Sequence, residues 1–215
     1  MLKRRKVIQI STTILFVILL ALRKVQFWMA IFGISLLLSI YFGRFYCGYI
    51  CPINTGMELI NNNADKNKRK RKSVPEVFKK PLIRYGILVL FLGTMIMVFK
   101  TGKKLPVLPV LFGLGIIITI FYKPEFWHRY LCPYGTLLSI FSRFNKKSYM
   151  VVNENCIKCG RCVKACPSDA ILWGDKEEYP VIIQNECLLC GKCKEACLTD
   201  AIKYQFKSKK LQNKR

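Results

Sequence analysis

Histidine and acidic side chains are scarce in this 215-residue chain. It has one histidine, and its 12 aspartates and glutamates stand against 36 lysines and arginines. A single histidine excludes a haem held by two histidines. The sequence also lacks G-x-G-x-x-G and phosphate-loop motifs, so that no nucleotide or flavin cofactor is predicted. The long apolar runs contain no acidic, basic or histidine side chain, and no catalytic acid or base is assigned.

Three abundant features remain, and they seldom occur together. The formal net charge is +24, hydrophobic residues make up 52% of the chain, and there are 11 cysteines. A strong positive charge first suggests nucleic acid or a membrane surface. A secreted disulfide scaffold would be smaller and poor in long apolar runs. High charge with high hydrophobicity excludes a plain soluble enzyme unless the two are segregated along the chain.

The apolar residues are concentrated in four charge-free runs within the first 122 residues. We predict membrane spans at about 7–22, 25–43, 84–99 and 105–122. A spanning helix needs about 20 residues, and flanking lysine and arginine stems can extend the shorter runs by snorkelling. All four runs lack the polar face that soluble helices keep. No small-x-small cleavage site follows the first run, which favours a signal anchor over a cleaved signal peptide.

The basic residues are distributed unevenly around these runs. With a cytoplasmic N-terminus, and counting residues 1–104 only, 14 lysines and arginines fall on the inner side and 5 in the outer turns. This bias predicts a multi-pass protein of the cytoplasmic (inner) membrane with both termini in the cytoplasm. The basic run Lys66–Lys72 is typical of a nucleic-acid patch as well. Between two predicted spans it is better explained as a topology signal on anionic headgroups, and no nucleic-acid partner is predicted.

Two cysteine motifs of equal spacing follow Asn155. The first is C-x2-C-x2-C-x3-C-P, with Cys156, Cys159, Cys162 and Cys166. The second begins 31 residues later, with Cys187, Cys190, Cys193 and Cys197. The similarity continues beyond the cysteines, because Ser168–Ile171 parallels Thr199–Ile202. The segment is therefore an internal duplication.

The spacing has a chemical consequence. Three cysteines at two-residue gaps surround one cubane, and the fourth reaches the other cubane. The first [4Fe–4S] cluster is predicted on Cys156, Cys159, Cys162 and Cys197. The second is predicted on Cys187, Cys190, Cys193 and Cys166. Zinc sites use paired knuckles at wider separation, and disulfides are not expected on a cytoplasmic segment.

The three other cysteines lie in two related motifs, 47–52 and 128–133. The motifs align at an offset of 81 residues, so that Cys51 matches Cys132 and His128 takes the place of Cys47. Each follows a predicted span that ends in the cytoplasm, and each proline (Pro52, Pro133) is well placed to begin a helix. Three interpretations stay open for Cys47, Cys51, His128 and Cys132. They are a shared metal or third iron–sulfur site, a redox-active thiol pair, and simple packing.

These motifs carry a family resemblance. Paired Cys-x3-Cys-Pro motifs after membrane helices, followed by two ferredoxin motifs, resemble membrane iron–sulfur proteins of the quinol-dehydrogenase type in periplasmic nitrate reductase systems. The same module resembles the membrane core of regulators that serve nitrous-oxide reductase. Residues 150–206 resemble a bacterial two-cluster ferredoxin. His128 departs from the pattern, which usually has cysteine there.

The resemblance implies a fold and a function. We expect an α-helical membrane protein with four transmembrane helices in two repeats and a C-terminal α+β ferredoxin-like domain. The expected domains are 1–149 (membrane), 150–206 (two [4Fe–4S] clusters) and 207–215 (basic tail). The expected role is electron transfer between a quinol pool or cytoplasmic donor and a partner redox enzyme, by a subunit rather than a stand-alone enzyme. The alternative is an assembly or regulatory factor that reduces a metal or cofactor for another enzyme.

Overall fold

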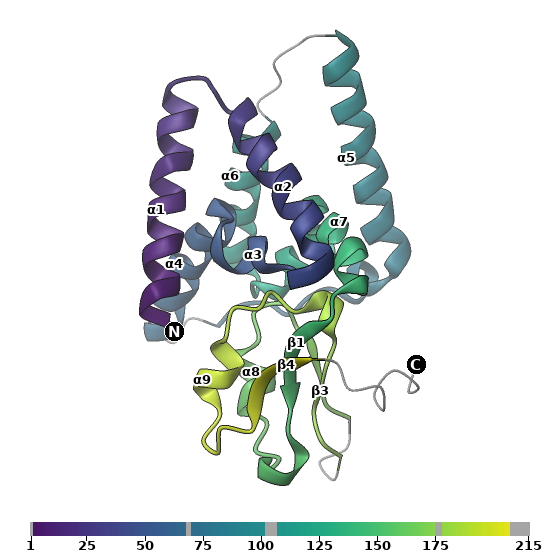
Figure 1. Ribbon diagram of the computed structural model, residues 1–215. Helices are drawn as coiled ribbons and strands as arrows, with labels where there is room; N and C mark the ends of the chain where they lie inside the picture. The colour runs from purple at the N-terminus through teal and green to yellow at the C-terminus, as the bar shows by residue number, and fades with distance from the viewer. Residues whose placement is uncertain (1, 68–69, 102–106, 175–177, 207–215) are drawn as a thin grey trace. The chain divides into compact units, whose positions relative to one another are not determined.

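The computed structural model describes residues 2–67, 70–101, 107–174 and 178–206 (Figure 1). The chain forms two compact units, which are described separately below: residues 1–50 with 138–215, and residues 51–137. Several predicted features lie outside the described residues. They are the basic tail 207–215, part of the basic run (68–69) and the start of the fourth apolar run (105–106).

Each of the four apolar runs forms a helix. The helices are α1 (Leu2–Ala21), α2 (Gln26–Phe42), α5 (Pro81–Thr101) and α6 (Val107–Phe121). Within the described residues one of them, α5, is long and apolar enough to cross a bilayer, with a mean hydropathy of 1.9 over Pro81–Val98. Helices α2 and α6 are apolar but have 17 and 15 residues. The described part of the fold is thus mostly helical, and one described helix, α5, combines the length and the apolar composition of a membrane span.

In the first unit, α1 and α2 are joined by a tight turn and fastened to a short helix, α3 (Phe45–Tyr49). Arg23 in the turn has a left-handed backbone, with φ of 55°. The rings of Phe16 and Trp28 meet edge to face at 5.2 Å, and the Trp28 indole N–H donates to the Tyr46 hydroxyl at 2.8 Å. These contacts hold α3 beneath the two apolar helices.

The same unit contains a small α+β part. Strand β1 (Lys147–Val151) pairs antiparallel with β4 (Ile202–Phe206), with Tyr149 opposite Tyr204. Strand β2 (Ile171–Leu172) pairs antiparallel with β3 (Val181–Ile182). Helices α8 (Arg161–Ala165) and α9 (Lys192–Ala196) contact each other and are visible beside the strands in Figure 1. A buried cluster that includes Tyr149, Ile171, Ile182 and Ile202 packs with several cysteines between these elements.

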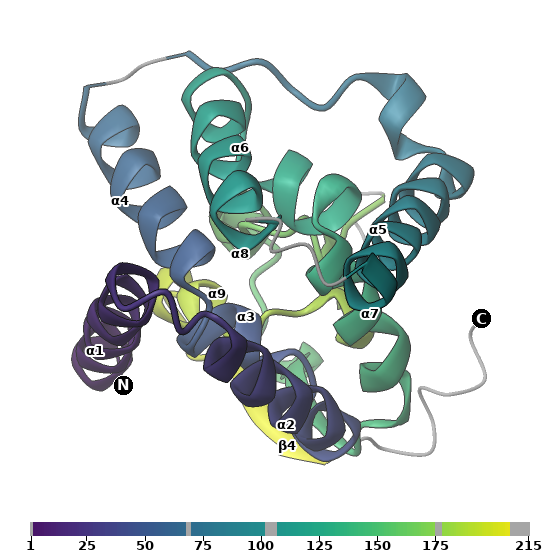
Figure 2. The same ribbon diagram turned by 90° about the horizontal axis from the view of Figure 1, so that it is seen from above.

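The second unit is built on helices that begin at the two motif prolines. Helix α4 (Pro52–Lys66) lies beside α6 (Figure 2). Helix α7 (Pro133–Phe141) begins in this unit and ends in the other. Between α6 and α7 the chain forms η2 (Phe126–Leu131), a π-helical turn. Both helices begin at the motif prolines, which confirms the prediction. The physical reason is that a proline at the first helical position loses no hydrogen bond.

Candidate metal centres

One cavity of the first unit is lined by thiols from both halves of the duplication. Cys187, Cys190 and Cys193 line it together with Cys166. The remaining lining is mostly apolar and includes Tyr149, Leu188 and Ile182. Three cysteines of one motif and one of the other therefore face a common space. This donor set is the one that a [4Fe–4S] cluster needs.

A second cavity repeats this arrangement with the complementary cysteines. Cys156, Cys159 and Cys162 line it together with Cys197. The rest of the lining includes Val151, Ile157 and Pro180. Each cavity thus offers four thiols and an apolar surround. The residues present fit one [4Fe–4S] cluster in each cavity.

Two glycines shape the cysteine loops. Gly160 and Gly191 precede α8 and α9 with φ of 69° and 75°, a left-handed conformation that costs other residues energy. A Cβ at Gly160 would also lie 2.3 Å from the ring of Trp173. The last cysteine of each motif accepts a backbone hydrogen bond, from Ala170 to Cys166 and from Ala201 to Cys197, at 3.3 Å in both cases. The loops therefore turn tightly and present amides to sulfur.

The thiols differ in their affinity for protons. Burial, followed by the neighbouring Cys190, raises the pKa of Cys187 to about 12. Burial also raises the pKa of Cys193. For Cys197 burial is the largest single influence and raises the pKa, but hydrogen bonds from Thr199, Ala201 and Ile202 together outweigh it and lower the pKa of this thiol. Because iron binds thiolates, a cluster in the cavity lined by Cys187 and Cys193 must displace protons from these buried thiols.

The two cysteine loops lie in different surroundings. In the first motif the side chain of Ile157 is 59% exposed and Cys159 is exposed. At the equivalent position of the second motif Leu188 is 2% exposed. The backbone of Gly48 lies against this loop, because a Cβ at Gly48 would come within 2.2 Å of the Leu188 carbonyl oxygen. The second loop is therefore enclosed by α3, whereas the first faces outward.

A buried charge pair accompanies the enclosed loop. Arg44 Nη1 donates to Glu186 Oε2 at 2.9 Å, and the two side chains are 0% and 6% exposed. Ser139 Oγ donates to the other carboxylate oxygen at 2.9 Å. The sequence analysis did not single out either charged residue. A usable signal was present, however, because Glu186 replaces Asn155 in the internal repeat.

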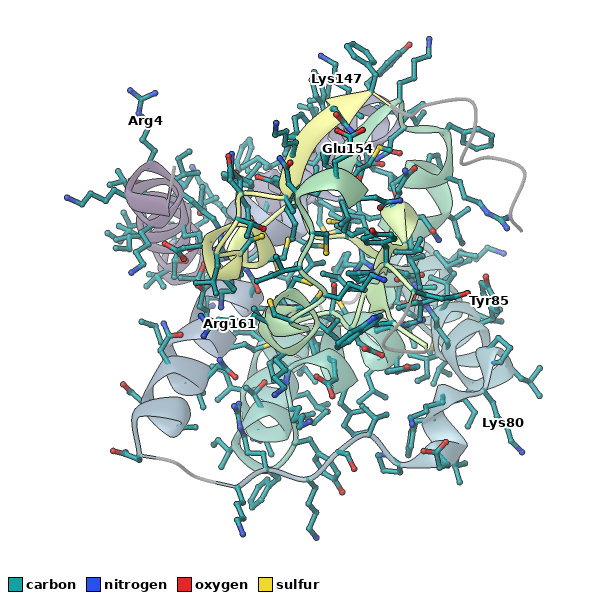
Figure 3. The ribbon with its side chains drawn as sticks, turned by 90° about the horizontal axis from the view of Figure 1, so that it is seen from below. Arg4, Lys80, Tyr85, Lys147, Glu154 and Arg161 are labelled. Atoms are coloured by element: carbon teal, nitrogen blue, oxygen red, sulfur yellow. The ribbon has the colours of Figure 1, made fainter. Side chains whose placement is uncertain are left out.

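Helix α1 also reaches this region through polar side chains. Arg5 Nε and Gln9 Nε2 both donate to the Gly48 carbonyl oxygen, at 3.0 and 3.1 Å. Arg5 is 2% exposed, whereas its neighbour Arg4 points away from α1 in Figure 3. The hydrogen bonds satisfy a carbonyl that is buried beside the second cysteine loop.

The remaining candidate residues are divided between the two units. Cys47 lies in α3 of the first unit, where burial raises its pKa and the nearby Arg44 opposes the rise. Cys51, His128 and Cys132 lie in the second unit. There the pKa of Tyr134 is raised by burial and further by Cys132 and Cys51, so that both cysteines lie near one phenol. His128 is 5% exposed, in the π-helical turn.

A single-ion site is not formed by these side chains. Within residues 2–67, 70–101, 107–174 and 178–206, no three histidine, cysteine or acidic side chains are grouped to hold one metal ion. A cubane is larger than an ion, so the two thiol-lined cavities are not excluded by this finding. The role of Cys47, Cys51, His128 and Cys132 therefore stays a prediction.

Comparison with known proteins identifies iron–sulfur domains in both parts of the chain. A family model described as a 4Fe-4S binding domain matches residues 25–73 and 105–150. A model described as a 4Fe-4S dicluster domain matches residues 155–201. The chain therefore contains ferredoxin-type domains and carries two [4Fe–4S] clusters.

Several curated proteins are similar to this chain over about 60% of its length. An uncharacterized protein of Methanocaldococcus jannaschii is 32% identical over 150 residues, 62% of this chain and 63% of its own length. The methylamine utilization ferredoxin-type protein MauN of Paracoccus denitrificans is 24% identical over 64% of this chain and 54% of its own length. The regulatory protein NosR of Stutzerimonas stutzeri is 26% identical over 59% of this chain and 20% of its own length. The chain spans between half and two thirds of the length of the first two of these relatives. These similarities support an electron-transfer role in general terms.

Proposed function

We propose that this protein is a membrane-anchored electron-transfer protein with two [4Fe–4S] clusters on defined ligands. The first cluster is held by Cys156, Cys159, Cys162 and Cys197, and the second by Cys187, Cys190, Cys193 and Cys166. The observation that carries the proposal is the lining of the two cavities, each with three thiols of one motif and one of the other. When bound, each cluster accepts and releases one electron. The protein supplies thiolates, amide donors and an apolar surround.

Exposed apolar side chains support the membrane anchoring. Large apolar residues on α1, α2, α5 and α6 are more than half exposed, among them Val7, Ile14, Leu37, Leu82, Leu90 and Ile117. Apolar surface on this scale is covered by lipid or by another protein. We therefore propose four spans near 7–22, 25–43, 84–99 and 105–122, a membrane domain over 1–149, a ferredoxin domain over 150–206 and a basic tail over 207–215. Both termini lie in the cytoplasm in this proposal, following the distribution of lysine and arginine.

The partners follow from this placement. A redox partner protein exchanges electrons with the clusters, and the donor is a quinol pool or a cytoplasmic protein. A quinol-dehydrogenase role of the periplasmic nitrate reductase type is the most specific form of the proposal. MauN, a ferredoxin-type protein by name, supports this electron-transfer class.

A second candidate function is favoured by one relative. NosR is named a regulatory protein, which fits an assembly or regulatory factor that reduces a metal or cofactor for another enzyme. The two functions predict different phenotypes in a deletion strain. Loss of electron delivery leaves the partner enzyme inactive with its cofactors in place, whereas loss of an assembly factor leaves the partner without a cofactor.

The direct test is anaerobic purification in detergent, followed by iron analysis and EPR of the reduced protein. Two clusters give about eight iron atoms per chain. About twelve would indicate a third cluster, and its loss in Cys51→Ala would assign it to Cys47, Cys51, His128 and Cys132. Fewer than about four irons with stoichiometric zinc would contradict the electron-transfer proposal. Extraction into buffer without detergent would contradict the membrane anchoring.

A further inference from the structure

We infer that Arg44 and Glu186 set the reduction potential of the second cluster and make it different from that of the first. The inference rests on the ligand assignment in the proposed function. It concerns two charged residues that are not ligands and that belong to segments 142 residues apart in the chain.

The pair is held in place from several directions. The Arg44 side chain is fully buried, and its Nη1 lies 2.9 Å from Glu186 Oε2. Ser139 Oγ donates to Glu186 Oε1 at 2.9 Å, and Ser168 Oγ donates to the Glu186 carbonyl at 3.0 Å. Glu186 directly precedes the ligand Cys187. One carboxylate and one guanidinium are therefore fixed next to Cys187, which lines the cavity of the second cluster.

The internal repeat provides a comparison within the same chain. Asn155 precedes Cys156 as Glu186 precedes Cys187, and its carbonyl accepts from Thr199 as the Glu186 carbonyl accepts from Ser168. The two halves thus share a hydrogen bond from a hydroxyl to this carbonyl. They differ in the charge of the residue before the first cysteine, which is neutral in Asn155 and negative in Glu186. The hydrogen bond is common to both halves and therefore belongs to the fold that they share. The charges of Glu186 and Arg44 are found beside the second cluster only, so they are specific to it.

The charges of Arg44 and Glu186 act on the second cluster more strongly than equivalent charges would act on the first cluster. Cys159 is exposed, so water screens the first cluster, whereas Leu188 and Leu189 of the second loop are 2% and 6% exposed. Coulomb interactions are stronger where water is excluded. One-electron reduction takes an oxidised cluster with four thiolates from about −2 to about −3. The Arg44 charge favours the reduced state, and the Glu186 charge disfavours it.

The test is redox titration monitored by EPR on the full-length protein in detergent. The two signals are assigned with Cys156→Ala and Cys187→Ala, each of which removes one of them. Arg44→Met is expected to lower the potential of the second cluster, and Glu186→Gln is expected to raise it. Each change should shift the equilibrium for sharing an electron between the clusters by on the order of tenfold, which is about 59 mV for one electron. The double variant should lie between the two single variants, and the first cluster should not move.

A purely structural role predicts a different pattern. If the pair only docks α3 onto the loop, both single variants lose second-cluster iron or stability together, without potential shifts of opposite sign. That result, or equal shifts of both clusters, overturns the inference. Should Arg44→Met fail to retain its cluster, Glu186→Gln and the double variant still decide the sign. Failure of the proposed function is distinguishable, because the unmodified protein would then hold fewer than two clusters.

Discussion

Gly48 lies directly against the carbonyl oxygen of Leu188, so that a Cβ at position 48 would come within 2.2 Å of this backbone atom. The contact brings α3 to the enclosed cysteine loop, and no flexible side chain can yield there. We expect Gly48→Ala to cost about 1–3 kcal/mol through overpacking and to lower the occupancy of the second cluster. Spin quantitation of the reduced protein and thermal unfolding in detergent measure both effects.

A matched control for this substitution exists in α2. Gly33 has no atom within 4 Å of an added Cβ, so Gly33→Ala should leave both cluster signals unchanged. If Gly33→Ala has any effect on the free energy of unfolding, it should raise it by up to about 1 kcal/mol, because alanine has a higher helix propensity than glycine. Equal behaviour of the two alanine variants would contradict the close packing of α3 on the loop.

The glycines that precede α8 and α9 give a second pair of expectations. Both have a left-handed backbone, which costs an alanine about 1–2 kcal/mol. Gly160→Ala also collides with Trp173 at 2.3 Å, whereas the nearest atom to a Cβ at Gly191 is the Tyr149 hydroxyl at 3.3 Å. Gly160→Ala should therefore be the more destabilising of the two, by about 1–3 kcal/mol.

Chemical denaturation of the loaded protein can compare these variants. Adding Trp173→Ala to Gly160→Ala should recover the part of the loss that comes from the collision. The part that comes from the left-handed backbone should persist. An unchanged loss in the double variant would mean that the indole ring does not cause it.

Sequence reasoning works best here where chemistry depends on local spacing. The dicluster motif predicts two [4Fe–4S] clusters, which the family comparison confirms. Pro52 and Pro133 predict helix starts that the structure confirms, because a proline at this position needs no partner for a backbone N–H. The number of spans, by contrast, stays a prediction, since α5 alone among the described helices has both the length and the composition.

Contacts between distant segments of the chain could not be predicted from local sequence patterns. Arg5 counts as one of many basic residues in a topology argument, yet it is buried and bonded to Gly48, 43 residues away. The pairing of Arg44 with Glu186 is likewise set by tertiary packing and not by spacing. A faint signal did exist in the repeat, because Leu189 is apolar where the first motif has Lys158. Such asymmetry marks the loop that becomes buried.

The two adjacent arginines of α1 should respond very differently to truncation. Arg5→Ala removes a charged hydrogen bond to the Gly48 carbonyl and leaves that from Gln9. We expect a loss of about 1.5–3 kcal/mol, seen as a lower unfolding temperature in detergent. Arg4 is exposed, and Arg4→Ala should remain within about 0.5 kcal/mol of the unmodified protein. Similar values for both would indicate that charge number alone matters at this end of α1.

Removal of the clusters should unfold the ferredoxin part selectively. Its strands have two to five residues, and a domain of about 60 residues buries too little surface to be robust without a metal or disulfide. After oxidation and chelation, proteases should cleave within 150–206 while the far-ultraviolet circular dichroism retains the signal of the long helices. Reconstitution with iron and sulfide should restore resistance, because metal-binding energy is folding energy in such domains. A cluster-free protein that stays resistant would show that the thiol-lined cavities are self-supporting.

Two glycines of α6 allow the effect of packing on stability to be distinguished from the effect of helix propensity. A Cβ at Gly115 would lie 2.8 Å from Ile53 Cγ2 and 3.1 Å from the Trp127 ring, whereas Gly113 has no atom within 4 Å. Gly115→Ala should push α6 away from α4 and η2 and cost about 1–3 kcal/mol. Gly113→Ala should be neutral or mildly stabilising. The comparison is best made by thermal unfolding in detergent with Trp fluorescence, because Trp127 reports on the contact directly. A shift in Trp emission for Gly113→Ala but not for Gly115→Ala would contradict the assigned face of α6.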